Sequence, residues 1–511
     1  MSEISTAGII LYILYPVILI SISFYSVHGR EVTPEVYFFA DRKMPWWILG
    51  FSFLTASAAG PLFILIASGT DPLSSLITCA ISMIMILLLS RSLAHLYQKN
   101  KIRTFPEYFE IRFDRKCRLF LSAVYIVNNI FLRLVVVIIM GSIFINMAAG
   151  YDAFTSLIYF LVIAGLYVIN GGIKSEMNTN VIHAVLIIIA MAAVTGWNVS
   201  QNISTGHFQN KITPLFFSGS AANPEITPAG LAAGLPVIGF WFWCMDQMIV
   251  QKLMSGKSLR HIRKSGVFAV ILQLIPAGVF IYTAPFLQSV FRPAIPASLQ
   301  DGAFAGSGFP VSMRLFFIMA VLSVMMTSTA AIFNSTSALV TFDFFRTLKP
   351  GSSERKLVLV GRLTTLMLLF FSILLIPTTQ VINAGTCMKL IMISSYLAAM
   401  TAAVFIAGLL SKKIRSTGAF ITLCLAAFIT GLRVVSELVY EGDKAGNMVP
   451  DWLVQLNFLE FSAALFLLSL ILPIAISGLS TGFSIFRSFI KSPKENLIKL
   501  KYKWNTHRKV F

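Results

Sequence analysis

Long apolar runs recur along the whole chain and decide what it can fold into. Each run is about 20 residues long, the length that an α-helix needs to cross the ~30 Å hydrocarbon core of a bilayer. Hydrophobic residues make up 57% of the 511 residues and charged residues only 12%, whereas soluble domains are roughly a quarter charged. A membrane β-barrel would show alternating segments of ~10 residues instead. The sequence therefore predicts an all-α integral membrane protein.

Thirteen runs have this character, and we expect each to be a transmembrane helix. They cover approximately residues 8–27, 45–69, 72–95, 117–147, 154–170, 178–197, 228–251, 265–289, 310–341, 358–378, 385–410, 417–440 and 456–478. No linker or low-complexity segment divides them, so residues 1–511 are expected to form a single polytopic domain. The first run lacks the basic flank of a signal peptide and is expected to be retained.

The basic residues are distributed unevenly between the predicted loops. If the N-terminus is outside, the inner loops and the C-terminal tail hold 30 of the 40 Lys and Arg residues, and the outer loops hold three. This is the positive-inside bias of membrane proteins. It predicts a cell membrane protein (plasma or inner membrane) with a cytoplasmic C-terminus, and it argues against nucleic-acid binding. We expect the basic tail, 479–511, to lie on anionic inner-leaflet lipid; binding of a partner by the tail is the alternative.

Residue patterns for catalysis are missing from the sequence. The five cysteines are scattered without metal or disulfide spacing, and no nucleophile–base pair or Gly-rich phosphate loop is visible. We therefore expect no enzyme activity and no organic cofactor. Asn198 and Asn202 begin glycosylation sequons in a predicted outer loop.

Two predicted spans are interrupted by helix-breaking residues. In "SFLTASAAGPLFI", Pro61 removes the hydrogen-bond partner of the Ser57 carbonyl, and Gly60 makes unwinding easier. In "GLPVIGFWFWCMDQMIVQKL" (234–253), Gly and Pro residues and the pair Asp246-Gln247 interrupt the run. Interrupted helices in corresponding positions of two halves indicate a transporter site. They are the second and seventh spans, so we expect five-helix repeats at about 45–197 and 228–410 after a leading helix, with two trailing helices.

A broken helix leaves carbonyl oxygens that must find partners inside the membrane. The carbonyls around 55–59 could be satisfied by a bound cation, or by water and side chains at a simple kink. A later span, "VMMTSTAAIFNSTS" (324–337), adds six hydroxyls, at Thr327, Ser328, Thr329, Ser335, Thr336 and Ser337. Carbonyl and hydroxyl oxygens suit a hard monovalent cation, whereas a proton relay needs titratable side chains.

Few carboxylates fall within the predicted spans. Asp246 lies near an inner helix end, Glu437 can pair with Arg433 one turn back, and Glu460 begins the last span. Arg133 is placed mid-span, where it either has a functional role or braces a contact between helices.

Several motifs resemble the sodium:solute symporter family, and its sodium–glucose cotransporter branch in particular. They are "YFFADRKMPWWILGFSFLTASAAG", "TFPEYF", "WCMDQMIVQKLMSGKS", "IFNSTSALVTFDFF" and "STGAFITLCLAAFITGLRVVSELVYEG". The resemblance covers about residues 8–440 and implies a leucine-transporter-type fold of inverted repeats with alternating access. It also implies a Na+ site made by the carbonyls of Thr55, Ala58 and Val324 with the hydroxyls of Thr327 and Ser328.

The solute pocket departs from the resemblance. Positions that are polar in sugar-transporting members hold other residues here. The family's inner Asp, which is thought to assist the exit of sodium, is matched by Asn180 in this chain. The pocket residues that the resemblance implies are Ser57, Leu62, Cys79 (or Thr78), Phe242, Trp243, Gln273 and Ile391. Sugar recognition needs dense hydrogen bonding. We therefore expect a sodium-coupled symporter for a small organic solute, sugar-like or less polar; a solute sensor or non-transporting regulator on the same fold is the alternative.

Overall fold

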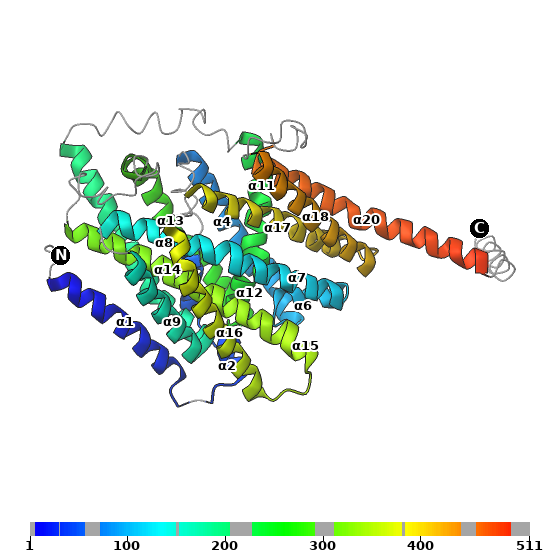
Figure 1. Cartoon of the computed structure of the whole chain (residues 1–511), viewed down its shortest axis with the longest axis horizontal. Coiled ribbons are helices and arrows are strands. Elements are labelled where there is room, and N and C mark those ends of the chain that lie inside the picture. Colours follow the sequence, from blue (N-terminus) through cyan, green and yellow to red (C-terminus); the bar gives the residue numbers. More distant parts are fainter. Residues whose placement is uncertain are drawn as a thin grey trace.

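The chain folds almost entirely into helices (Figure 1). The computed structural model describes residues 6–29, 31–56, 72–149, 153–204, 227–291, 311–380, 384–440 and 456–491. Of the helices within these ranges, nine are long and apolar enough to cross a membrane. The predicted all-α membrane architecture is therefore confirmed, whereas the count of thirteen spans stays a prediction.

The first half of the chain comprises the elements from α1 to α9. They are α1 (Thr6–Val27), α2 (Pro34–Phe39), η1 (Ala40–Arg42), an apolar helix Trp46–Ala56, α4 (Pro72–Leu88), η2 (Leu89–Leu93), α5 (Ala94–Lys99), α6 (Phe105–Arg112), α7 (Arg115–Val127), η3 (Asn128–Arg133), α8 (Leu134–Ala149) and α9 (Ala153–Ser204). The predicted break at Gly60 and Pro61 lies outside the described residues.

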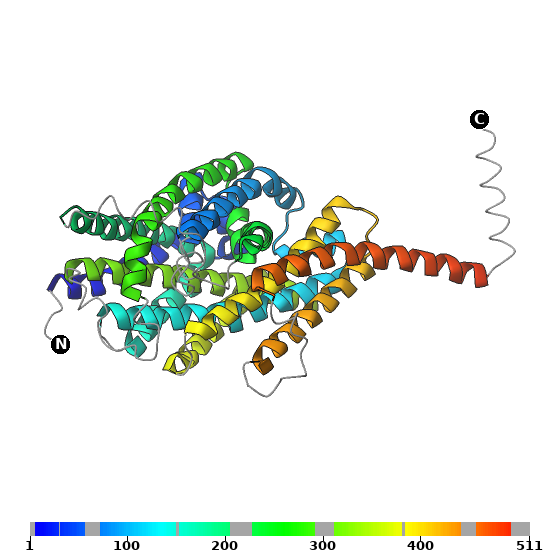
Figure 2. The same ribbon diagram turned by 90° about the horizontal axis from the view of Figure 1, so that it is seen from above.

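The second half begins after the outer loop that the sequence predicts. Its elements are α11 (Pro228–Phe240), η4 (Trp241–Met245), α12 (Gln247–Met254), α13 (Leu259–Phe291), α14 (Val311–Leu339), η6 (Val340–Phe345), α15 (Arg346–Leu348), α16 (Glu354–Leu375), η7 (Ile376–Gln380), α17 (Ala384–Leu410), α18 (Ser416–Tyr440) and α20 (Phe458–Lys491). α20 extends to Lys491 and projects beyond the bundle (Figures 1 and 2).

Helix α14 is the centre of the bundle. It packs against α8, α9 and α16, and 89% of its most apolar window is buried, the largest share among the nine candidate spans. A helix at the periphery of the bundle, such as α16, instead exposes one apolar stripe, which includes Leu363, Met367, Phe370 and Leu374. Such a stripe at helical spacing faces lipid. Between Ser323 and Ser337 of α14, every hydroxyl-bearing residue is buried except Ser328, which is partly buried.

Helix α9 contains two predicted spans joined at a sharp bend. Gly172 has φ 56° and ψ −141° inside the helix, a left-handed conformation that side-chain-bearing residues rarely adopt. A Cβ atom there would lie only 2.1 Å from the carbonyl oxygen of Tyr37 on α2. Glycine is therefore required both by the backbone angle and by the close approach of α2.

The interruption predicted in 234–253 is present, and it falls at Asp246. The helical path of α11 widens into the π-turn η4 and then breaks, because Asp246 is extended (φ −60°, ψ 131°). Its carboxylate accepts a hydrogen bond from the amide of Met248 at 2.9 Å and so caps α12. Gly234, Pro236 and Gly239, which also suggested a break, lie within α11.

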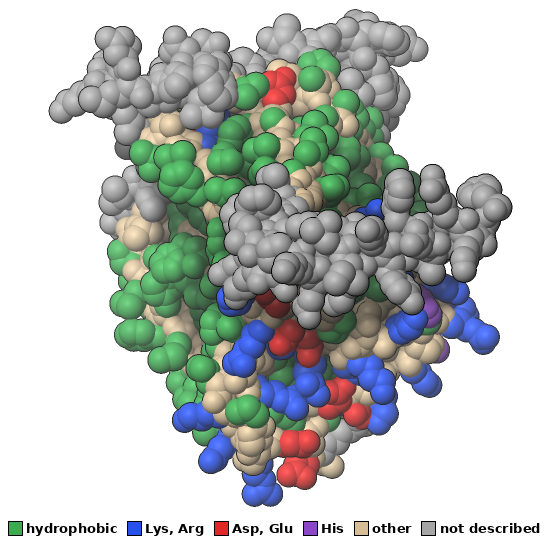
Figure 3. Space-filling view, turned by 90° about the vertical axis from the view of Figure 1, so that its right-hand side faces the viewer, with side chains coloured by type: hydrophobic (Ala, Val, Ile, Leu, Met, Phe, Trp, Pro, Cys, Tyr) green, Lys and Arg blue, Asp and Glu red, His purple; other side chains and the backbone are tan. Residues whose placement is uncertain are grey.

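The motif "FPEYF" forms the short helix α6, with Pro106 in its first turn. This helix is not a surface element, since Phe105 and Phe109 are fully buried and their rings contact Phe405 of α17. Lys and Arg side chains gather on the end of the molecule where α6 and α15 lie (Figure 3). This end corresponds to the loops that the sequence analysis places inside.

Candidate ion and solute site

A line of polar side chains joins α9 to the buried helix α14. Glu176, Asn180 and His183 follow one another at intervals of four and three residues, so they share one face of α9. All three are fully buried. Each faces a polar group on α14, directly or through one side chain, and we call these three contacts the polar ladder. The polar ladder is the main buried polar connection between the two helices in the described part of the chain.

The middle contact of the ladder involves a predicted sodium ligand. The Thr327 hydroxyl donates to Asn180 Oδ1 at 2.7 Å, and Thr327 is 2% exposed. A hydroxyl that donates its proton keeps its oxygen lone pairs available. Thr327 therefore presents a buried oxygen that is able to coordinate a cation, and Asn180 fixes the direction of its proton.

The other predicted ligands on α14 lie within one turn of Thr327. The Ser328 hydroxyl donates to the carbonyl of Val324 at 2.7 Å, which again leaves lone pairs on the hydroxyl oxygen. Thr55 is buried near the end of the helix Trp46–Ala56, and its hydroxyl donates to the carbonyl of Ser52 at 3.1 Å. Ala58, the fifth predicted ligand, lies outside the described residues.

The two end contacts of the ladder were not predicted from the sequence. At one end, the Tyr15 hydroxyl contacts both His183 Nδ1 at 2.6 Å and Ser323 Oγ at 2.8 Å, and so links α1 to both helices. At the other end, Asn334 Nδ2 donates to a carboxylate oxygen of Glu176 at 2.5 Å.

Glu176 also forms a buried ion pair. Its other carboxylate oxygen lies 2.9 Å from Nζ of Lys252 on α12, and both side chains are at most 2% exposed. Glu176 falls between two predicted spans, so the sequence analysis did not count it among the membrane carboxylates. The signal that could have found it is the spacing of Glu176, Asn180 and His183 on one helix face.

Arg133 and Asp246, which the sequence placed in different spans, form an ion pair between η3 and the break before α12. The Arg133 guanidinium also lies over the ring of Trp241, 4.9 Å from its centroid. The structure thus places Arg133 in a brace between helices. Gln247 is likewise a structural contact, because its Oε1 accepts from the amide of Phe105 at 2.7 Å at the start of α6.

The predicted solute residues are only partly brought together by described contacts. Gln273 on α13 donates to the Ser82 hydroxyl, which in turn donates to the carbonyl of Cys79 on α4 at 2.9 Å. Gln273 and Cys79 are therefore neighbours across α4 and α13. The Oε1 atom of Gln273 is buried without a hydrogen-bond partner among the described residues.

The aromatic residues of the predicted pocket come from η4. Phe242 and Trp243 contact edge-to-face with centroids 5.2 Å apart. Trp243 is buried and Phe242 partly buried. Ile391 is partly buried on α17 and packs against the cluster that contains Val324. Ser57 and Leu62 lie outside the described residues.

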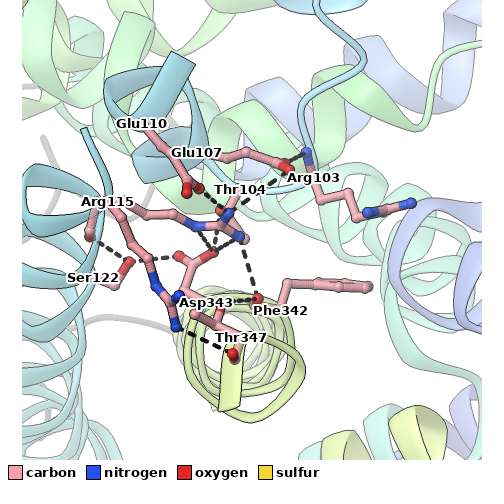
Figure 4. A network of polar contacts seen from close by, with 10 residues as sticks. Arg103, Thr104, Glu107, Glu110, Arg115, Ser122, Phe342, Asp343 and Thr347 are labelled. Carbon is pink, nitrogen blue, oxygen red and sulfur yellow. Dashed lines mark hydrogen bonds and ion pairs between the residues drawn. The ribbon is translucent and has the colours of Figure 1, made fainter. Parts of the chain in front are cut away.

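A second polar network holds the adjacent ends of several helices together (Figure 4). The buried carboxylate of Asp343 on η6 accepts from Thr104 at 2.6 Å, from Ser122 at 2.5 Å and from Arg118 Nη2 at 2.6 Å. Arg118 also pairs with Glu110 at 2.5 Å. The network fixes η6 to α6 and α7. The sequence analysis missed Asp343 because it lies just beyond the predicted end of its span.

Of the two remaining carboxylates that the sequence analysis discussed, Glu437 pairs with Arg433 at 2.6 Å, as predicted. Glu460 accepts from the Thr227 hydroxyl at 2.6 Å and so ties α20 to the start of α11.

Comparison with known proteins agrees with this architecture. The model of the sodium:solute symporter family matches residues 37–426. Similar proteins include sodium/glucose cotransporter 1 of Ovis aries, 26% identical with 93% of this chain and 78% of that protein covered. Sodium/glucose cotransporter 4 of Danio rerio is also 26% identical, with 98% and 82% covered.

Among solved structures, the fold is similar to that of a Na+-coupled sialic acid symporter in a substrate-bound, outward-open state. The TM-score is 0.75 at 18% sequence identity, covering 93% of this chain and 98% of that one. The leucine-transporter-type fold is therefore shown. Together with the match over residues 37–426, these findings establish that the chain belongs to the sodium:solute symporter family, a family of transporters.

Proposed function

We propose that the protein is a symporter that uses a sodium gradient to move a small organic solute, sugar-like or less polar, by alternating access. The observation that carries this proposal is the arrangement of Val324, Thr327 and Ser328 on a buried turn of α14. Three oxygens of the hard type that Na+ prefers lie within one turn, where Val324 and Thr327 are buried and Ser328 is partly buried. Family membership supports the same coupling ion.

In this proposal, Na+ is coordinated by carbonyl oxygens of Thr55, Ala58 and Val324 and by hydroxyl oxygens of Thr327 and Ser328. Ligands from two separate helices make the site sensitive to their relative position. Movement between the repeats, 45–197 and 228–410, would then create and destroy the site, which is the physical requirement for coupling ion binding to alternating access.

The solute would bind beside this site, between α4, η4, α13 and α17. The aromatic pair Phe242 and Trp243 offers an apolar surface, and Gln273 offers a carbonyl oxygen without a partner among the described residues. This combination of few polar groups and large rings favours a solute with a smaller hydrogen-bonding demand than a hexose.

Uptake into proteoliposomes tests the proposal. The full chain is reconstituted, an inward sodium gradient is applied, and accumulation is measured across a panel of labelled sugars, polyols and less polar solutes. We expect at least one solute to accumulate with sodium and not with potassium outside. Equal uptake in the two buffers would contradict sodium coupling, and solute-evoked currents without accumulation would favour the sensor alternative.

A further inference from the structure

A basic groove opens at the inner ends of two neighbouring helices, away from the proposed sodium site. It has a volume of about 740 Å³ and lies between η2 and the first turns of α13, within the ~300–1,000 Å³ typical of ligand sites. Four cationic side chains line it: Arg91, Arg260, Arg263 and Lys264. All four are exposed.

The structure shows no anionic partner for these four cations among the residues that it describes. Among the described residues, none of them forms an ion pair with a carboxylate. Arg263 and Lys264 lie three and four residues after Arg260, so both repel Arg260 on one face of α13. They also lie in its first two turns, where the helix dipole disfavours positive charge. An anion in the groove would relieve both repulsions.

The other wall of the groove is apolar and continues along the helix toward the middle of the membrane. Val267 and Ile271 line the groove and are exposed, and Leu274 continues the same face of α13. The adjacent helix α4 exposes Ile84 and Leu88 before reaching Arg91. The stripe 267–275 rises ~12 Å, close to the ~15 Å depth of one leaflet.

The elements on the two sides of the groove are in contact with each other, and an aromatic pair lines the groove. Helices α4 and α13 lie side by side (Figure 2). At Gly266 on α13 a Cβ atom would lie 2.1 Å from Oγ of Ser90 on η2, the continuation of α4, so α13 and η2 are in direct contact there. Trp46 and Phe268 pack edge-to-face beside the cations, with centroids 5.0 Å apart. Aromatic side chains of this kind concentrate at the headgroup level of membranes.

We propose that this groove is a binding site for an anionic phospholipid. The phosphate and any further negative charge of the headgroup contact Arg91, Arg260, Arg263 and Lys264, and one acyl chain lies along Val267 and the residues that follow it. A free phosphate ion would satisfy the cations but would leave the apolar wall unused. None of the residues that line the site belongs to the basic tail or to the proposed sodium or solute ligands.

Native mass spectrometry of the full chain with phosphatidylglycerol, and with phosphatidylcholine as the neutral lipid, tests the proposal. We expect about a fivefold loss of affinity for each charge removed. The quadruple variant Arg91→Gln, Arg260→Gln, Arg263→Gln, Lys264→Gln should then bind the two lipids equally. The matched control converts four exposed lysines of other inner loops to Gln: Lys116, Lys356, Lys412 and Lys413. It should bind phosphatidylglycerol as the unaltered protein does.

Two further arms separate a lipid from a free anion. Val267→Gln with Ile271→Gln keeps all four cations, and we expect it to weaken phosphatidylglycerol binding. Glycerol 3-phosphate, which has no acyl chain, should compete at least 100-fold less effectively than the lipid. The proposal is overturned if the quadruple variant and the control lose lipid equally, or if glycerol 3-phosphate competes as well as the lipid. Sodium-dependent uptake is measured separately, so the two proposals fail independently.

Discussion

At the scale of single residues, the hydroxyl of Thr327 is the most direct test of sodium binding. Thr327→Val removes one proposed ligand and leaves the buried Oδ1 of Asn180 without its donor. An unsatisfied buried acceptor costs about 1–3 kcal/mol. That cost falls on stability. Loss of one of five ligands is expected to weaken sodium binding by about 1.4 kcal/mol, which is tenfold in affinity. We therefore expect the sodium concentration for half-maximal uptake to rise about tenfold, measured as the sodium dependence of initial uptake rates.

Thr329 supplies the matched control for this experiment. It is equally buried, two residues further along α14, and its hydroxyl has no hydrogen-bond partner among the described residues. Thr329→Val should leave the sodium dependence unchanged and the protein at least as stable. If both variants raise the sodium requirement equally, the effect comes from repacking of α14, and Thr327 is not a ligand.

The buried ion pair between Glu176 and Lys252 gives a second residue-scale prediction. Lys252→Met would leave the Glu176 carboxylate buried without its counter-ion, which costs about 3–5 kcal/mol. We expect the melting temperature of the purified protein to fall by several degrees. Adding Glu176→Gln to this variant should restore most of the loss, because the uncompensated charge is then removed.

Melting curves of the two single variants and the double variant form a double-mutant cycle. Additive effects of the two substitutions would contradict the pairing.

The sequence analysis undercounted the buried carboxylates. Glu176 and Asp343 are both fully buried, and each was missed because it lies beside a predicted span boundary.

At the scale of elements, the bend in α9 depends on one glycine. Gly172→Ala would force a side-chain-bearing residue into a left-handed conformation and place its Cβ 2.1 Å from the Tyr37 carbonyl oxygen. Backbone strain of this kind costs about 1–3 kcal/mol before the clash is counted. We expect a strong reduction in folded protein, measured as the monodisperse fraction in size-exclusion chromatography.

Gly196→Ala is the matched control in the same helix. Nothing lies within 4 Å of a Cβ built at Gly196, and alanine is favoured over glycine in helices by roughly 0.5–1 kcal/mol. This variant should be as stable as the unaltered protein or slightly more so. A normal yield of Gly172→Ala would show that α2 and α9 do not approach each other as described.

The elements also show how far periodicity and helix-breaking residues predict structure. The sequence analysis correctly predicted an interruption at Asp246 and Gln247. A polar residue that can cap a new helix is visible in the sequence itself, and Asp246 caps α12. Gly234 and Pro236 gave the same signal but lie inside α11. Tertiary packing decides which of several possible breaks is used, because neighbouring helices can satisfy the carbonyls that proline leaves free.

At the scale of the whole molecule, the charge bias predicts the orientation. After removal of the partly exposed Cys424, a single cysteine at Lys412→Cys should react with a membrane-impermeant maleimide only in inside-out vesicles. Lys444 belongs to the predicted outer loop between the spans 417–440 and 456–478, so a cysteine at Lys444→Cys should react only in right-side-out vesicles. The other four native cysteines are buried and should add little background. Labelling of both positions from the same side would contradict the predicted topology.

The sequence by itself determined the properties that depend on local composition. Run length and hydropathy specify membrane helices because the bilayer has a fixed thickness. The distribution of Lys and Arg predicts orientation, and the hydroxyl-rich stretch 324–337 indicated a candidate ion site, because each is readable within one segment. The resemblance to the family then implied Thr327 and Ser328 as the ligands. The family motifs then gave the fold, which the structural comparison confirmed.

Only the tertiary structure decided which polar groups meet. Arg133 and Asp246 are 113 positions apart in the sequence, and Thr327 and Asn180 are 147 apart. Such pairs depend on how each helix is rotated about its axis and where its neighbour crosses it, and neither quantity is encoded in hydropathy. The same physics produced the basic groove. Arg91 and the cations of α13 do not stand out in the sequence and become a site only because η2 and α13 bring them together.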